Sequence, residues 1–126
     1  MLFPGQGSQS AGMLREAFDE FLCVRETFCE ASDHLDLDLW ALTQSGSETK
    51  LNLTENTQPV LLAASVGLWR EFLNQGAILP SILAGHSLGE FSALVCGGAI
   101  DFRDAIKLVQ YRGQFMQQAV PVGVGA

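Results

Sequence analysis

A serine between two glycines, in residues 85–89, constrains the fold of this 126-residue chain more than any other feature. A short apolar run at residues 82–84 precedes it, and a segment with helical spacing follows it. This order is typical of a sharp strand-to-helix turn that holds a serine hydroxyl clear of the backbone. Glycines suit the flanking positions because side chains there would collide across the turn. The pattern therefore predicts a strand, a turn and a helix, with Ser87 as the candidate nucleophile.

The rest of the chain predicts several helices and little sheet. In order, we expect a strand cut short at residues 1–3, a helix over 12–35, surface connections over 33–38 and 44–50 around an apolar turn at 39–42, a helix from 57 to 75 with Pro59 in its first turn, a buried strand over 80–84, helices over 88–96 and 101–119, and a connection over 120–126. Two strands cannot cover so many amphipathic helices. The chain is therefore expected to be part of an α/β domain.

Composition excludes some classes of protein. The formal net charge of −7 is spread along the chain, which argues against a nucleic-acid binder. The longest apolar stretch, residues 60–69, is too short to span a membrane, and the first residues lack the pattern of a signal peptide. Three cysteines without metal-ligand spacing are interpreted as buried free thiols. These features predict a cytoplasmic protein.

Two backbone N–H groups could stabilise an oxyanion next to Ser87. The N–H of Leu88 lies at the start of the predicted helix, where the helix dipole favours negative charge. A second N–H could come from the glycine-rich turn in residues 3–9, in which two glycines surround Gln6. That turn by itself is equally typical of a plain strand-to-helix loop.

Arg112 is the third candidate. On the helix predicted for residues 101–119, it falls within about 60° of Ala105, Val109 and Met116, in the middle of an apolar stripe. A guanidinium there needs an anion. Spacing alone slightly favours a structural ion pair with a carboxylate of the chain over a binding group for a substrate carboxylate.

Neither histidine is a convincing general base. His86 is next to Ser87, and neighbouring side chains on such a turn diverge. His34 lies in an acidic segment that is expected to be exposed. A serine without a base is a poor nucleophile near neutral pH.

Together, four motifs resemble the malonyl-CoA:acyl carrier protein transacylase family of fatty-acid synthesis over essentially the whole chain. They are Phe3-Pro4-Gly5-Gln6-Gly7-Ser8-Gln9, Thr57-Gln58-Pro59, Gly85-His86-Ser87-Leu88-Gly89-Glu90 with the following Phe91-Ser92-Ala93-Leu94, and Arg112-Gly113. The resemblance implies an α/β-hydrolase-like large subdomain with parallel strands and a nucleophile elbow. Family members are at least about twice as long and continue into a small ferredoxin-like subdomain, which is absent here. Residues 1–126 would be the N-terminal part of the acyltransferase domain, incomplete at the C-terminus.

The resemblance also implies a reaction and roles for residues. Malonyl would pass from CoA to Ser87 and then to the phosphopantetheine thiol of acyl carrier protein in a ping-pong transfer. Ser87 would be the nucleophile, with the oxyanion hole at Gln6 and Leu88 and the malonyl carboxylate on Arg112. Gln58 and His86 would lie near the pocket without an assigned step. The catalytic histidine would lie beyond this chain, so the chain alone would be inactive; no cofactor or metal is implied, and the full-length protein would be a monomer.

Other functions are alternatives on the same sequence. An acyltransferase domain of a polyketide synthase shares these motifs, but a long upstream linker would normally precede it. A serine esterase or thioesterase is a second alternative, although its neutral acyl chains have no use for Arg112. A binding or regulatory module that ends at Ala126 is a third, and the unfinished sheet argues against it.

Overall fold

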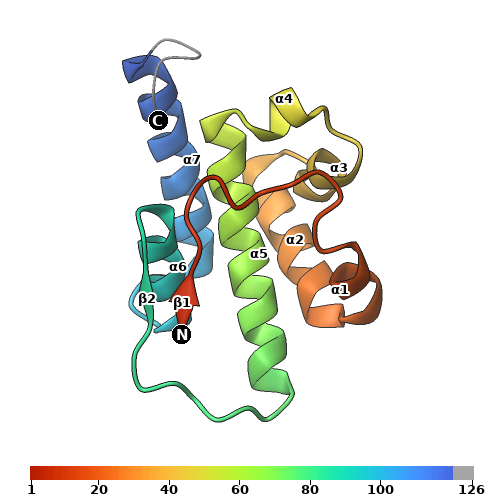
Figure 1. Ribbon diagram of the computed structural model, residues 1–126, viewed down its shortest axis with the longest axis vertical. Helices are drawn as coiled ribbons and strands as arrows, with labels where there is room; N and C mark the ends of the chain where they lie inside the picture. Colours follow the sequence, from red (N-terminus) through yellow and green to blue (C-terminus); the bar gives the residue numbers. More distant parts are fainter. Residues whose placement is uncertain (121–126) are drawn as a thin grey trace.

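The computed structural model describes residues 1–120 of the chain. Its elements, in order, are β1 (Leu2–Phe3), α1 (Arg15–Glu20), α2 (Leu22–Leu35), α3 (Leu39–Gln44), α4 (Glu48–Leu51), α5 (Thr54–Asn74), β2 (Ala84–Gly85), α6 (Leu88–Cys96) and α7 (Phe102–Ala119). The expected connection over 120–126 lies almost wholly outside the described residues. The described part is thus mostly helical (Figure 1).

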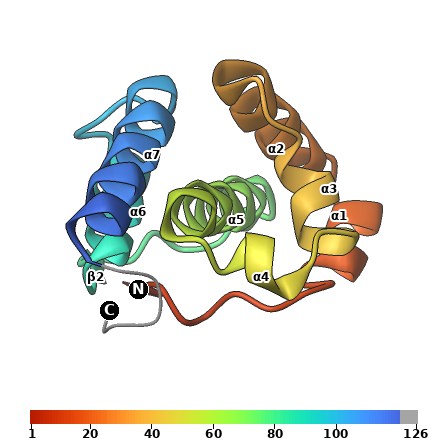
Figure 2. The ribbon, with the colours of Figure 1, turned by 90° about the horizontal axis from the view of Figure 1, so that it is seen from above.

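Helix α5 is the centre of the molecule. It packs against α2 on one side and against α6 and α7 on the other (Figures 1 and 2). Residues 57–67 of α5 are all buried, and they include the apolar stretch from Val60 to Ala64. A helix that is apolar around its whole circumference has to be enclosed by its neighbours. The core therefore lies around α5.

The two strands form a small parallel sheet beside α6. Leu2 pairs with Ala84 and Phe3 with Gly85, and the chain enters α6 two residues after β2. The parallel pairing and the strand–turn–helix order around Ser87 agree with the sequence-based expectation. A sheet of two strands with helices is consistent with part of an α/β fold.

The prediction of a buried strand over residues 80–84 is wrong. The strand consists of Ala84 and Gly85, and the side chains of Leu79 and Ile82 are 63% and 73% exposed. β1 pairs only with Ala84 and Gly85, so residues 80–83 have no strand beside them in the described part. The apolar residues of this run are present in the sequence, but no other part of the described structure packs over the Ile82 side chain.

The single helix predicted for residues 12–35 is two helices. Phe21 has an extended backbone (φ −107°, ψ 117°) and separates α1 from α2. The Arg25 guanidinium donates to the carbonyls of Phe18 and Asp19, both at 2.7 Å. These bonds satisfy carbonyl groups that the break leaves without intrahelical donors. The apolar spacing continues across Phe21, so it could not reveal the break.

The region predicted to consist of connections holds two short helices, and α5 begins earlier than expected. The Asp38 side chain caps α3 by accepting from the Ala41 N–H, and the Ser47 side chain caps α4. Helix α5 starts at Thr54, so Pro59 lies beyond its first turn. Proline there removes the hydrogen bond that the Glu55 carbonyl would otherwise accept.

Candidate functional site

Ser87 has an unusual backbone conformation between β2 and α6. Its dihedrals are φ 54° and ψ −107°, a region that residues with a side chain rarely adopt. The turn closes tightly, because a Cβ on Gly85 would collide with the backbone of Gly89, and one on Gly89 would collide with the Phe3 carbonyl. Both glycines are therefore required by close approach. This conformation presents the half-buried Ser87 side chain at the start of α6.

The glycine-rich turn after β1 lies directly against the Ser87 turn. A Cβ on Gly5 would come within 2.8 Å of the His86 carbonyl oxygen. The Gln6 side chain donates to Thr54 Oγ1 at 3.1 Å, which ties the turn to the start of α5. Within residues 1–120, the N–H groups of Gln6 and Leu88 have no acceptor. Two unused donors thus come from adjoining turns.

A close contact between α5 and α7 brings Arg112 to the same place. A Cβ on Gly113 would lie 2.6 Å from both the Glu55 Cα and the Thr54 carbonyl oxygen. Because Gly113 has no side chain, the backbone of α7 can approach the first turn of α5. The neighbouring Arg112 side chain then reaches across to α5 and to the Ser87 turn.

The Arg112 guanidinium contacts Ser87 directly. Its Nη2 donates to Ser87 Oγ at 3.0 Å, its Nη1 donates to Gln58 Oε1 at 2.8 Å, and its Cζ lies 5.5 Å from the centre of the Phe91 ring. Among the described residues, no carboxylate lies within 4.0 Å of it. The structural ion pair that spacing slightly favours is therefore not formed there. Of the five N–H donors of an arginine, these two bonds use two.

Gln58 belongs to this site, although the sequence assigns it no step. Its side chain is completely buried in α5, and its Nε2 donates to Met116 Sδ at 3.2 Å. A glutamine directly before a continuous apolar run is the signal that could have marked it, because a buried amide needs partners. The structure gives it partners on α7.

The two histidines do not pair with Ser87. His34 Nε2 accepts from Arg103 Nε at 3.2 Å, in the first turn of α7, whereas the contact with Ser87 is made by Arg112 in the middle of that helix. The exposed His86 side chain makes no hydrogen bond to Ser87 among the described residues. Within residues 1–120, Ser87 thus has a guanidinium partner but no hydrogen bond to a histidine.

Cys23 and Cys96 are not rival nucleophiles. Burial raises the pKa of the Cys96 thiol to about 12, and burial together with a hydrogen bond to Glu71 raises the pKa of Cys23. Both groups are therefore protonated at neutral pH. All three cysteines are free, as expected, but none is fully buried: Cys23 and Cys96 are half-buried, and Cys29 is exposed.

Residues 1–120 contain neither a cluster of metal-ligating side chains nor a helix able to span a membrane. No group of three or more His, Cys, Asp or Glu side chains there could hold a metal ion. No helix in this part of the chain has the length and apolar character needed to cross a membrane.

A serine on a strained strand-to-helix turn, with free N–H donors and a guanidinium around it, is an arrangement suited to acyl transfer. Residues 1–126 match the family model described as the acyl transferase domain, and the chain belongs to that family.

Two similar curated relatives carry the same name. The malonyl CoA-acyl carrier protein transacylases of Salmonella typhimurium and Escherichia coli K12 are 60% and 58% identical to this chain over 124 and 125 residues. These matches cover 98% and 99% of this chain and 40% of each relative. The chain thus spans about two fifths of their length.

Solved structures agree with the fold. The acyl carrier protein S-malonyltransferase of Vibrio cholerae has a TM-score of 0.93 at 59% identity, and the match covers 97% of this chain and 40% of that one. A malonyl-transacylase solved in complex with a type II polyketide synthase acyl carrier protein also has a TM-score of 0.93, at 60% identity, covering 96% and 39%. The chain therefore has the fold of the corresponding part of these acyltransferases.

Proposed function

We propose that this chain forms part of a malonyl-CoA:acyl carrier protein S-malonyltransferase. The observation that carries the proposal is the 3.0 Å contact between Arg112 Nη2 and Ser87 Oγ. An acyl group attached to Ser87 would begin within hydrogen-bond reach of an arginine that has no carboxylate partner in the described part of the chain. The relatives' names support malonyl as that acyl group.

The first half of the reaction uses Ser87 as nucleophile on a nucleophile elbow. The hydroxyl oxygen attacks the thioester carbonyl of malonyl-CoA, and the hydroxyl proton passes to a general base. The resulting oxyanion is held by the N–H groups of Gln6 and Leu88. When the carbonyl re-forms, the C–S bond breaks and CoA leaves as its thiol, with the proton returned by the base. Malonyl remains as an ester of Ser87.

The second half repeats the chemistry with a different nucleophile. The base takes the proton of the phosphopantetheine thiol of acyl carrier protein, and the sulfur attacks the Ser87 ester. The tetrahedral intermediate collapses, the C–O bond to Ser87 breaks, and the base returns its proton to the serine oxygen. Malonyl leaves as the thioester of acyl carrier protein, and the serine hydroxyl is restored. The base is proposed to be a histidine outside this chain. His34 instead accepts a hydrogen bond from Arg103, and His86 forms no hydrogen bond with Ser87 among the described residues.

Arg112 selects an acyl group with a carboxylate close to its carbonyl carbon. In malonyl, one methylene separates the ester carbonyl from the carboxylate, so a malonyl group on Ser87 can reach a guanidinium that already touches the serine oxygen. A planar guanidinium binds carboxylates with paired hydrogen bonds. A neutral acyl chain would leave this cation without an anion, which disfavours an esterase.

Acyl carrier protein is the proposed acceptor. One similar solved structure is titled as an acyl carrier protein in complex with its malonyl-transacylase, and the curated relatives carry the carrier protein in their names. A cytoplasmic location, a monomeric full-length protein and the absence of a cofactor are proposed on the family resemblance.

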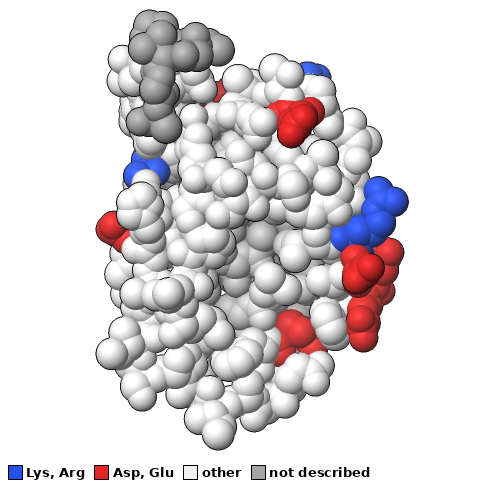
Figure 3. Space-filling view, viewed as in Figure 1, with Lys and Arg blue, Asp and Glu red and all other residues white. Residues whose placement is uncertain are grey.

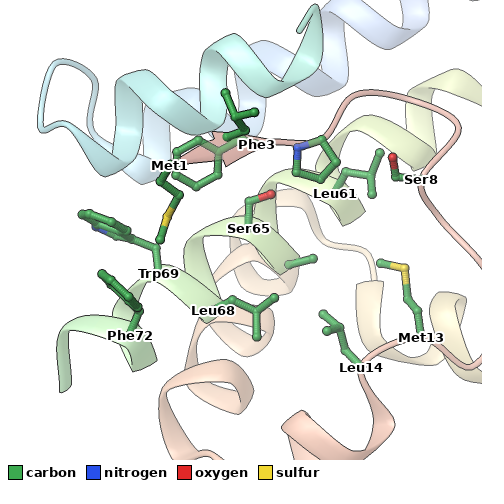
Figure 4. Close-up of a pocket in the computed structure, with 13 residues that line it drawn as sticks. Met1, Phe3, Ser8, Met13, Leu14, Leu61, Ser65, Leu68, Trp69 and Phe72 are labelled. Carbon is green, nitrogen blue, oxygen red and sulfur yellow. The ribbon is translucent and has the colours of Figure 1, made fainter. Parts of the chain in front are cut away.

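We also propose that residues 1–126 are the N-terminal part of the acyl transferase domain. An apolar groove of about 490 Å³ lies between β1, the segment before α1 and one face of α5 (Figure 4). Its lining residues are Met1, Leu2, Phe3, Pro4, Ser8, Met13, Leu14, Leu61, Ala64, Ser65, Leu68, Trp69 and Phe72. Few charged side chains lie over β1 and α5 on this face (Figure 3). Such a face suits coverage by the polypeptide that accounts for the rest of the relatives' length.

The reading frame beyond Ala126 tests this domain proposal. An open frame of a length that matches the relatives would support it. A stop codon directly after Ala126 in the gene would contradict it.

Substitution of Arg112 tests the proposed substrate class. In a full-length protein that carries this chain, Arg112→Ala should lower kcat/KM for malonyl-CoA by about 100-fold or more, because a charged partner of the acyl group is lost. Transfer from acetyl-CoA, which has no carboxylate, should fall far less. The measurement is steady-state transfer from both CoA esters to holo acyl carrier protein.

Arg112→Lys is the matched variant. Lysine keeps the charge but cannot form the paired hydrogen bonds, so it should restore only part of the malonyl activity. If Arg112→Ala lowers malonyl and acetyl transfer equally, Arg112 supports the structure and the substrate assignment is wrong.

A further inference from the structure

We propose that Gln58 positions the Arg112 guanidinium and, because its amide is neutral, leaves the arginine charge available for the acyl carboxylate. This inference rests on the proposed function and adds a residue that determines specificity. The Gln58 side chain hydrogen-bonds to Arg112 and Met116 and not to Ser87, so its role is positioning and not catalysis.

The geometry holds the guanidinium from two sides. Arg112 Nη1 donates to Gln58 Oε1 at 2.8 Å, and Nη2 donates to Ser87 Oγ at 3.0 Å. The Phe91 ring lies 5.5 Å from the Arg112 Cζ atom. A long side chain such as arginine loses conformational entropy when it is fixed. Gln58 supplies the contact that fixes it from α5, across the interface with α7.

The orientation of the Gln58 amide is determined by its partners. The guanidinium only donates, so the amide oxygen must face it. The Nε2 then faces Met116 Sδ at 3.2 Å, and the thioether sulfur is a weak acceptor. The reversed amide would place donor against donor at Arg112. The buried amide therefore has one stable arrangement.

Neutrality is the second part of the argument. A glutamate at this completely buried position would place a carboxylate against Arg112 and form the internal ion pair that is absent from the described residues. A carboxylate carries a full negative charge and can accept paired hydrogen bonds from arginine, whereas an amide oxygen is a neutral, single acceptor. The internal carboxylate would then compete with the malonyl carboxylate for the same cation. The amide holds the guanidinium without this competition.

The amide-to-carboxylate change Gln58→Glu tests this neutrality in a full-length protein that carries the chain. The ratio of kcat/KM for malonyl-CoA to that for acetyl-CoA should fall at least about tenfold, mainly through a higher KM for malonyl-CoA. The matched control is Gln110→Glu, the same change at a half-buried position of α7 that has no hydrogen bond to Arg112. That variant should keep the ratio of the unmodified protein.

A second variant tests positioning without any need for activity. Gln58→Met keeps the length of the side chain but removes the strong acceptor. The measurement is NMR of the Arg112 guanidinium N–H groups, whose signals are identified by their loss in Arg112→Lys. Their exchange with water should be slow in the unmodified protein and in Gln58→Glu. They should exchange rapidly in Gln58→Met.

The two readouts separate this inference from the proposed function. Unchanged Arg112 signals in Gln58→Met, or an unchanged selectivity ratio in Gln58→Glu, would overturn the role of Gln58. An equal loss of malonyl and acetyl transfer in Gln58→Glu would also overturn it, since that outcome marks a structural residue. If the unmodified protein transfers no malonyl, the proposed function fails, and the NMR comparison still decides whether Gln58 positions Arg112.

Discussion

The backbone of Ser87 is strained for a residue with a side chain. At φ 54° and ψ −107°, the Cβ atom meets the neighbouring peptide groups. Such conformations cost on the order of 1–3 kcal/mol and persist where the surrounding structure enforces them. The tight contacts of Gly85 and Gly89 enforce this one. A strained serine next to a guanidinium is explained by function better than by stability.

Replacement of Ser87 by glycine and by alanine should therefore affect stability differently. Both variants lose the hydroxyl that contacts Arg112, but only Ser87→Gly relieves the strain. After the entropic cost of an added glycine, we expect Ser87→Gly to be about 1 kcal/mol more stable than Ser87→Ala. Denaturant unfolding of both full-length variants measures the difference. Equal stability, or a more stable alanine variant, would contradict the strain.

At the residue scale, the sequence predicts identities but not pairings. Ser87 and Arg112 stand out because their residue types are unusual in their local patterns. The bond between Arg112 and Gln58 joins residues 54 positions apart, on two helices whose relative placement no local pattern contains. For Arg112, spacing shows that a cation lies on the apolar face of its helix, but it does not show which group binds that cation. Spacing alone therefore slightly favours a structural ion pair, which the described residues do not form.

At the element scale, the contact between α5 and α7 decides whether the site is assembled. Gly113 is buried against the first turn of α5, and the adjacent Arg112 crosses to Gln58. Helix propensity alone favours alanine over glycine inside a helix by about 1 kcal/mol. The close approach opposes that preference at this position.

Gly113→Ala tests the contact through the sign of its effect. The added methyl group would lie 2.6 Å from the Glu55 Cα, so the helices must separate. We expect a loss of about 1–3 kcal/mol of unfolding free energy instead of the gain that propensity predicts. Thermal or denaturant unfolding measures it, with Gln118→Ala at an exposed position of α7 as the control. A stabilised Gly113→Ala variant would show that the helices are not in close contact.

Elements are predictable where one periodic pattern has clear ends. Helix α6 matches its predicted range of 88–96, and α7 begins after the capping Asp101, as expected. The break at Phe21 escapes prediction because the apolar spacing continues across it, and the Arg25 contacts that satisfy its carbonyls form only in the folded chain. Helices α3 and α4 are too short for periodicity to reveal. The strand before Ser87 is shorter than predicted because apolar composition does not ensure a neighbouring strand.

At the scale of the whole molecule, the site and the apolar groove occupy different parts of the fold. Ser87, Arg112 and Gln58 do not line the groove, which is formed by β1, α5 and the segment before α1 (Figure 4). We therefore propose that the groove serves packing within the domain and not binding of the acyl group. From the sequence, the small number of strands already predicts that the chain is part of a larger domain. The location of the apolar groove cannot be predicted from the sequence, because the groove forms only when α5 and β1 lie side by side in the folded chain.

The central claim is that Ser87 carries malonyl during transfer. The most direct test incubates the full-length protein with malonyl-CoA, without acyl carrier protein, and maps the adduct by peptide mass spectrometry. We predict one malonyl group on the peptide that contains Ser87, its release when holo acyl carrier protein is added, and no adduct in Ser87→Ala. Malonyl on another residue, or an adduct that persists in Ser87→Ala, would contradict the account.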